Sequence, residues 1–401
     1  MTETRHSDRR VLQCIAPRNI LSFGPNATSL DLLGLNVLIG SNGSGKSNLL
    51  DVISLMRATP ADLRAVVRRG GGPGEWVWKG GKGEPASAEI AVGNPAGEQP
   101  LRHYLSFRGV EAAFRLEEEF IESEASPPEG TEDFFRYVYH PGQSVSISAR
   151  RAGLVEKREL ALERFKADHS ILAQYRAPDL FPEIAYLAEF YEGVRIYREW
   201  AFGRNTVFRE PQKADMRNDR LEEDFSNLGL VLNRMRSKHP AAKQAILDGL
   251  KDLYDGVTDF EVFVEGGSVQ VFVHEGDFIV PATRLSDGTL RYLCLLTILC
   301  DPQPGPLICI EEPELGLHPD ILPKIADLLV AASERTQLIV TTHSDILVDA
   351  MTERPEAVVV CEKHEGQTQM HRLDRDKLAE WLERYRLGEL WIKGGIGGTR
   401  W

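Results

Sequence analysis

The feature that most constrains the fold of this 401-residue sequence is a glycine-rich loop set between an apolar run and a predicted helix. Residues 35–39 are apolar apart from one asparagine, and 40–47 match the pattern G-x-x-x-x-G-K-[ST]. Glycines let backbone amides approach phosphate oxygens, and the helix that follows adds its positive N-terminal end. The sequence therefore predicts a phosphate-binding loop made by Asn42, Gly43, Ser44, Gly45, Lys46 and Ser47. In this motif the lysine supplies charge to the β- and γ-phosphates, and the serine can bind Mg²⁺.

A second apolar run, at 307–310, ends in two adjacent carboxylates, Glu311 and Glu312. A buried strand can end in a carboxylate simply because it is reaching solvent. Two adjacent carboxylates, followed by Pro313 and Glu314, favour a role in binding Mg²⁺ and polarising water. Successive strand residues point to opposite faces, so one carboxylate can organise the metal shell while the other polarises a water molecule.

Two further segments carry candidate site residues. Ser286 and Gly288 lie directly before an apolar helix predicted at 289–300, where a serine or aspartate would cap the helix. An exposed helix N-terminus is also an anion site. His343 follows an apolar strand predicted at 338–341. A histidine there can cap the next helix, or it can reach a phosphate or the attacking water at the edge where such sheets bind ligands.

Composition limits the class of protein. The net charge of −13 and the isoelectric point near 5.4 argue against a surface wholly devoted to nucleic acid, although a local basic patch remains compatible. The five cysteines form no C-x-x-C pair, and most lie in apolar segments, which favours buried free thiols in a reducing compartment. The polar start and the lack of a long apolar run predict a cytoplasmic protein without a membrane segment.

The order of patterns predicts an α/β fold. From residue 285 onward helices alternate with short apolar strands, which is typical of a mainly parallel sheet flanked by helices. We expect an N-terminal lobe at 11–120 containing the phosphate loop and antiparallel strands. An insertion at 121–275 would contain a linker at 122–133 and would otherwise be mainly helical with one β-hairpin. A C-terminal lobe would occupy 276–401.

Taken in this order, the four segments resemble the ABC-type ATPase domain of the SMC/RecF/OLD group, which is often labelled an AAA-family ATPase. The phosphate loop resembles Walker A, 307–312 resembles Walker B with its catalytic glutamate, and 285–289 resembles the LSGGQ signature. The run 313–319, Pro-Glu-Leu-Gly-Leu-His-Pro, is similar to that of the OLD-like branch, and the end of the chain resembles stand-alone bacterial ATPases.

The resemblance implies the roles of individual residues. Glu312 would be the general base, His343 the switch histidine, and Glu311 and Ser47 would hold Mg²⁺. Gln174 is the best candidate for the metal-binding glutamine of the Q-loop. The resemblance also implies a head-to-head homodimer, with ATP between Walker A of one subunit and Ser286 and Gly288 of the other. Asp287 departs from the family's signature because it replaces a glycine and would repel a γ-phosphate unless turned away.

The function that follows is an ATPase whose dimerisation drives a conformational output on DNA or on a protein effector. By family analogy this would serve DNA repair or maintenance, or antiphage defence. The alternatives are an ATPase subunit of a transporter, a small-molecule phosphotransferase, and an ATP-binding scaffold without hydrolysis. Asp374 and Asp376 superficially offer the D-x-D of a Toprim nuclease, but the segment after His343 is too short for such a domain. We therefore interpret both as residues at a helix N-terminus.

Overall fold

A computed structural model describes the chain from residue 11 to 398, with gaps. The gaps are 95–98, 112, 124–133, 144, 152–153, 161–165, 167, 176, 202, 204–205, 208 and 255. Most of the predicted linker at 122–133 and the last three residues of the chain lie outside the described part.

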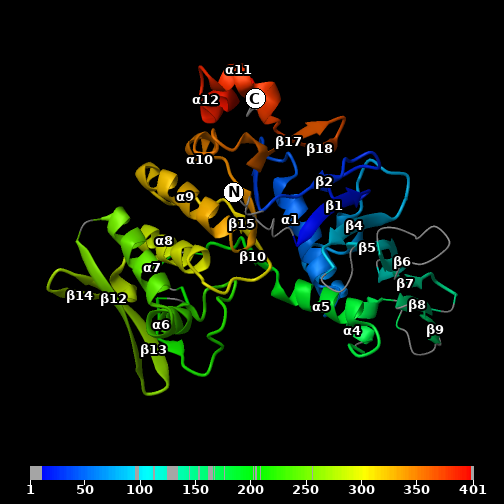
Figure 1. Cartoon of the computed structure of the whole chain (residues 1–401), viewed down its shortest axis with the longest axis horizontal. Coiled ribbons are helices and arrows are strands. Elements are labelled where there is room, and N and C mark those ends of the chain that lie inside the picture. Colours follow the sequence, from blue (N-terminus) through cyan, green and yellow to red (C-terminus); the bar gives the residue numbers. More distant parts are fainter. Residues whose placement is uncertain are drawn as a thin grey trace, which may run out of the picture.

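A six-stranded sheet forms the centre of the molecule (Figure 1). Five of its strands are parallel, and the last is antiparallel to its neighbour. In spatial order the strands are β10 (Arg195–Tyr197), β15 (Leu307–Glu311), β16 (Gln337–Thr341), β3 (Leu35–Ile39), β17 (Val358–His364) and β18 (Gln367–Arg372). The strand that leads into the glycine-rich loop therefore lies next to the histidine strand, and the carboxylate strand lies one position further out.

The central strands are mainly apolar because both faces of the sheet are covered. Alternate residues of one strand enter different cores, as the two-residue period of a strand requires. In β3, Val37 and Ile39 pack with the C-terminal helices, whereas Leu38 packs with the N-terminal lobe. In β15, Ile308 and Cys309 divide in the same way. The sheet is thus the wall shared by the two hydrophobic cores.

A second sheet, of eight antiparallel strands, is formed by residues N-terminal to the middle helices. Its spatial order is β2 (Leu30–Asp31), β1 (Leu12–Arg18), β4 (Ala86–Val92), β5 (Leu101–Val110), β6 (Ala113–Ser123), β7 (Phe134–Tyr139), β8 (Val145–Arg151) and β9 (Leu154–Leu160). The predicted lobe boundary at 120/121 falls inside β6, and β7 to β9 extend the same sheet. The expected insertion is therefore not mainly helical in its first part, because β7 pairs with β6, β8 pairs with β7 and β9 pairs with β8.

The rest of the middle segment is helical and carries a small third sheet. Its helices are α4 (Ile171–Gln174), α5 (Pro182–Gly193), α6 (Leu228–Lys238) and α7 (Pro240–Leu253). The strands are β11 (Gln212–Lys213), β12 (Val257–Glu265), β13 (Ser268–Glu275) and β14 (Phe278–Pro281). The predicted hairpin is confirmed, with Gly266 and Gly267 both at positive φ in its two-residue turn. Figure 1 shows α6, α7 and this small sheet at the end of the molecule opposite β6 to β9.

The remaining helices flank the central sheet or close the chain. They are α1 (Lys46–Arg57), α2 (Leu63–Arg69), α3 (Pro73–Trp76), α8 (Asp287–Leu299), α9 (Leu322–Ser333), α10 (Asp345–Asp349), α11 (Arg375–Leu382) and α12 (Leu387–Ile392). The expected alternation of helix and strand after residue 285 is confirmed. Asp374 is the N-cap of α11 and accepts the amide of Asp376 at 3.0 Å, as predicted for a helix start. No helix of the described residues is long and apolar enough to span a bilayer.

Candidate nucleotide-binding site

The candidate site lies where three neighbouring parallel strands end. Glu311 of β15 is in register with Thr341 of β16, which is in turn in register with Leu38 of β3. Because parallel strands present their carboxyl ends at one edge, the segments that follow them meet there. The glycine-rich loop, the two glutamates and His343 are thus brought to one edge of the sheet.

The glycine-rich loop has a backbone that only glycine adopts easily. Gly40, Gly43 and Gly45 have φ values of 148°, 76° and 105°, which are unfavourable for residues with a Cβ atom. The hydroxyl of Ser44 is buried and lacks a hydrogen-bond partner within the described residues. An unpaired buried hydroxyl inside a loop of this shape is what a phosphate group would satisfy. The arrangement therefore fits a phosphate.

Lys46 lies at the first position of α1 and is buried. Its Nζ atom donates hydrogen bonds to the carbonyl oxygens of Gly40 at 2.8 Å and Ser41 at 3.1 Å. Burial lowers the pKa of Lys46, while nearby acidic groups, Glu311 and Glu312 among them, act in the opposite direction. The ammonium group is thus held inside the loop, close to both candidate carboxylates.

Residues distant in sequence hold the loop in place. Thr368 on β18 donates a hydrogen bond to the carbonyl oxygen of Ser44 at 2.8 Å, and a Cβ atom on Gly45 would come within 2.2 Å of the threonine hydroxyl. A Cβ atom on Gly398 would lie 3.3 Å from Cα of Gly40. The C-terminal segment therefore packs against the start of the loop. Sequence reasoning missed these supports because nothing local marks them.

Ser47 and Glu311 form the candidate metal site. The hydroxyl of Ser47 donates a short hydrogen bond to Oε1 of Glu311 across the gap between α1 and β15. Hydroxyl and carboxylate oxygens are the donors that Mg²⁺ prefers. Of the predicted Mg²⁺ ligands, these two are in contact and fit the ion chemically.

Arg198 and Trp200, which follow β10, both contact Glu311, and neither was predicted from the sequence. Arg198 donates through Nε to Oε2 of Glu311 at 3.0 Å and also pairs with Asp51 on α1. Trp200 donates through its indole nitrogen to the backbone oxygen of Glu311 at 2.7 Å. The strand Arg195–Tyr197 has only three residues, one of them charged, so the local sequence carried no recognisable strand pattern and no signal for the residues that follow it.

Glu312 and His343 approach each other at the end of the strands. Oε1 of Glu312 is 3.4 Å from Nε2 of His343. Glu312 has a positive φ of 46°, a strained conformation for a residue with a side chain. Burial raises the pKa of its carboxyl, and the charges of Glu314 and Glu311 raise it further. A carboxylate with raised basicity next to a histidine is suited to accept a proton from water.

Glu314 fixes the backbone that carries His343. Its Oε1 atom accepts hydrogen bonds from the Thr342 hydroxyl and the His343 amide, each at 2.7 Å. Its second oxygen is buried without a hydrogen-bond partner within the described residues. The sequence showed Glu314 only as part of the Pro-Glu run, and its role in positioning the histidine appears only in the fold.

The signature-like segment begins α8. Ser286 is the N-cap and accepts the amide of Thr289 at 3.0 Å, and it is exposed. A Cβ atom on Gly288 would lie 3.4 Å from the carbonyl oxygen of Gly316 in the loop after Walker B. Asp287 is paired with Arg209, a buried arginine of the middle segment. The negative charge of Asp287 is therefore paired with a positive charge of the same chain.

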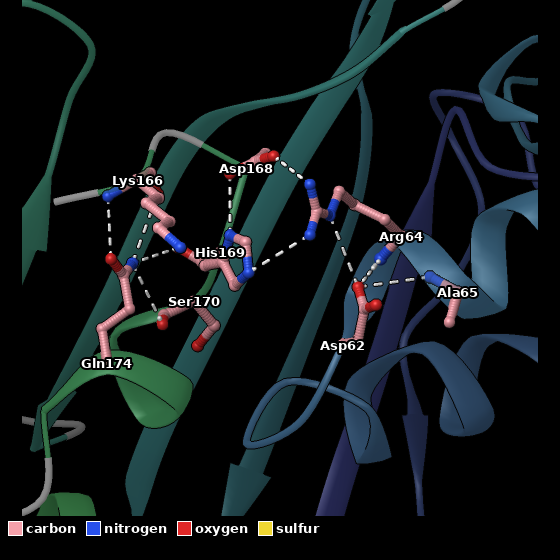
Figure 2. A network of polar contacts seen from close by, with 8 residues as sticks. All are labelled: Asp62, Arg64, Ala65, Lys166, Asp168, His169, Ser170 and Gln174. Carbon is pink, nitrogen blue, oxygen red and sulfur yellow. Dashed lines mark hydrogen bonds and ion pairs between the residues drawn. The ribbon is translucent and has the colours of Figure 1, made fainter.

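Gln174 does not join this cluster, so its predicted role as a metal ligand is not supported. Its amide binds the backbone around its own helix (Figure 2). Nε2 donates to the carbonyl of His169 at 2.9 Å, and Oε1 accepts the amide of Lys166 at 2.8 Å. The neighbouring ion pair joins Arg64 of α2 to Asp168. Gln174 thus shapes a loop beside the antiparallel sheet, because its hydrogen-bonding groups are already used there.

Comparison with known proteins places this site in a family. The model of a family described as "AAA domain, putative AbiEii toxin, Type IV TA system" matches residues 35–349, from the strand before the glycine-rich loop to the end of α10. The chain belongs to this family. The matched range spans the glycine-rich loop, the segment 285–289, the two glutamates and His343. No curated protein sequence matches the chain.

Solved structures show the same fold. The Smc head bound to the C-terminal winged-helix domain of ScpA aligns with a TM-score of 0.52 at 15% identity, covering 91% of this AAA protein and 99% of that chain. The Smc head of Pyrococcus furiosus, with an extended coiled coil and bound to the C-terminal domain of ScpA, aligns at 0.53 and 14% identity, covering 93% and 98%. These likenesses confirm the predicted fold class, an α/β P-loop ATPase fold of the ABC and SMC type.

Proposed function

We propose that this protein binds ATP with Mg²⁺ and hydrolyses it, with Glu312 as the general base. The observation that carries the proposal is the approach of Glu312 to His343 at 3.4 Å, at the edge where Lys46 and Ser47 begin α1. A phosphate-binding loop alone would serve many phosphotransferases. A carboxylate of raised pKa facing a histidine at the same edge favours activation of water.

Each residue has a distinct role in this proposal. The amides of the loop and Lys46 bind the β- and γ-phosphates, while Ser47 and Glu311 hold Mg²⁺, which neutralises phosphate charge when bound. Glu312 orients the attacking water and accepts its proton. His343, fixed through its backbone amide by Glu314, lies where it can hydrogen-bond the water or the γ-phosphate.

The second half of the site would come from another copy of the chain. Ser286 is exposed at the start of α8, and its hydroxyl hydrogen-bonds to Thr289 of the same helix start. In a head-to-head homodimer this helix end would face the γ-phosphate of ATP held by the other subunit's Lys46. The pairing of Asp287 with Arg209 supports the proposal, because it removes the negative charge that would otherwise repel the phosphate.

Dimerisation driven by ATP would be the output of the cycle. The comparison structures include Smc heads bound to domains of ScpA, which makes a protein effector or DNA a reasonable target for the output here. We place the protein in the cytoplasm, in DNA repair or maintenance or in antiphage defence. This context follows from family analogy and not from the site.

Glu312→Gln tests hydrolysis separately from binding. The substitution removes the base but keeps the shape, so turnover should fall by about 10²-fold or more while ATP stays bound. Glu334→Gln, which changes a residue just after α9, is the matched control and should turn over ATP like the wild type. The measurements are phosphate release and calorimetric ATP binding. A Glu312→Gln protein that hydrolyses ATP at the wild-type rate would refute the proposed mechanism.

A further inference from the structure

One charged side chain at the candidate metal site is not explained by the roles above. Arg198 directly follows β10, the edge strand that pairs with the carboxylate strand β15. Its guanidinium lies between Glu311, contacted through Nε at 3.0 Å, and Asp51 on α1. Asp51 is four residues after Ser47, so both lie on the same face of that helix. Arg198 therefore fills the space between the helix and the strand that together supply the metal ligands.

The carboxylate of Glu311 is divided between two partners. Oε1 accepts from the Ser47 hydroxyl, and Oε2 accepts from Arg198. The side chains of Glu311 and Arg198 are only 17% and 29% exposed, so solvent screens the pair less than it would at the surface. A cation that enters beside Ser47 must share Glu311 with the guanidinium.

Neighbouring side chains hold in place the segment that carries Arg198. The indole nitrogen of Trp200 donates a hydrogen bond to the carbonyl oxygen of Glu311 at 2.7 Å. The guanidinium of Arg291 in α8 stacks over the indole, with its Cζ atom 4.6 Å from the ring centroid. The segment that carries Arg198 is thus tied both to the carboxylate strand and to the helix that begins at the signature-like segment. A side chain held on two sides has little freedom to swing away from Glu311.

We propose that Arg198 sets the affinity of the site for its divalent cation, by neutralising Glu311 and Asp51 and by opposing the metal charge. This inference rests on the proposed binding of Mg²⁺ with ATP. With Arg198 present, the arginine and the two carboxylates carry one net negative charge. Without it they carry two. The more negative site attracts a divalent cation more strongly, because the Coulomb interaction grows with the charge at fixed distance.

Arg198 thus lowers the affinity of the site for the divalent cation. A neutral side chain at this place would bind the metal more tightly and would release it more slowly after hydrolysis. An arginine keeps the metal exchangeable while still orienting Glu311 toward Ser47. The expected signature is a gain of metal affinity on losing Arg198, which a purely structural role would not produce.

The test measures metal affinity directly in the full-length protein. Free Mn²⁺ is followed by electron paramagnetic resonance while it is titrated into protein saturated with the non-hydrolysable analogue AMP-PNP. Arg198→Gln should bind Mn²⁺ about tenfold more tightly than the wild type, as expected for removing one nearby positive charge. Arg198→Lys keeps the charge and should stay within about twofold. Arg217→Gln removes an exposed arginine paired with Asp219, and should change nothing.

A second variant keeps the inference testable if Arg198→Gln does not fold. Asp51→Asn removes a negative charge and should weaken Mn²⁺ binding, again by about tenfold. Unchanged or weaker Mn²⁺ binding by a folded Arg198→Gln protein would overturn the inference, as would equal effects of the Gln and Lys variants. Wild-type protein that binds neither AMP-PNP nor Mn²⁺ would instead refute the proposed function, so the two failures can be told apart.

Discussion

Nε2 of His343 lies 3.4 Å from Oε1 of Glu312, although the two residues follow different strands of the central sheet. The contact exists because β15 and β16 are adjacent and in register, and because the backbone turns at Glu312 with a positive φ. It joins the proposed base to the histidine that we propose contacts the water or the γ-phosphate. The protonation of Glu312 should therefore control turnover.

Turnover should fall on acidification sooner than it would with an ordinary glutamate. Burial raises the pKa of Glu312, and Glu314 and Glu311 add to the effect. The base must be ionised, so activity is present above this raised pKa and is lost as the pH falls through it. Steady-state rates between about pH 5 and 9 give the acid limb. Glu314→Gln removes one neighbouring charge and should move that limb to lower pH. A profile that is flat over this range would contradict the assignment.

Lys46→Ala should abolish binding of ATP with Mg²⁺. Lys46 is buried, and its Nζ atom is held against the carbonyl oxygens of Gly40 and Ser41 inside the loop, where it can neutralise phosphate charge. Isothermal titration calorimetry measures the affinity, and circular dichroism checks that the variant is folded. A folded variant with wild-type affinity would show that the loop does not bind the nucleotide through this residue.

Ser286→Arg should stop turnover while leaving ATP binding to the monomer nearly normal. The residue is exposed at the N-terminus of α8, so a bulky cation there blocks closure of a dimer and not the fold. Mixing Ser286→Arg with Lys46→Ala subunits gives dimers with one intact site and one doubly defective site. Partial activity should return in proportion to mixed dimers.

Light scattering provides an independent check of the dimer. Glu312→Gln protein in excess ATP with Mg²⁺ should have the mass of a dimer, because it binds ATP without consuming it. If it remains a monomer, the composite site is wrong.

Arg209 should contribute more to stability than its partner Asp287. Arg209 is buried and donates to the carbonyl oxygens of Ala282 at 3.3 Å and Leu285 at 2.7 Å. Arg209→Ala removes the guanidinium donor from both carbonyls and should cost about 2–4 kcal/mol of unfolding free energy. Asp287→Asn removes only an exposed charge and should cost less than about 1 kcal/mol. Urea unfolding measures both. Equal losses would mean that the ion pair, not the buried carbonyls, dominates.

Gly398→Ala should weaken ATP binding although Gly398 follows the last helix. Its φ is 64°, and a Cβ atom would lie 2.9 Å from Cγ1 of Val360 and 3.3 Å from Cα of Gly40. The added methyl group should push the start of the phosphate loop and lower ATP affinity by roughly tenfold, about 1.4 kcal/mol. Gly266→Ala has a similar φ of 57° but meets nothing within 4 Å, so it is the matched control. Equal ATP affinities of the two variants would rule out the contact as the cause.

Local sequence determined the elements whose pattern is continuous along the chain. The helix predicted after the glycine-rich loop forms as Lys46–Arg57, and the hairpin around Gly266 and Gly267 forms where two apolar runs flank a glycine turn. The Walker segments were recognisable because a phosphate cradle and a strand ending in carboxylates each need a short, continuous stretch.

Only the tertiary structure decided which distant side chains complete the site. Gln174 was chosen for its residue type, yet its amide binds its own loop. Arg198 lies at the metal site because a three-residue strand pairs with β15, and Thr368 reaches Ser44 because β18 lies beside β17. These contacts depend on strand order and register. Strand order and register cannot be read from the local sequence pattern. Many sequences can form a short buried strand, and only the packed sheet selects which strands lie next to it.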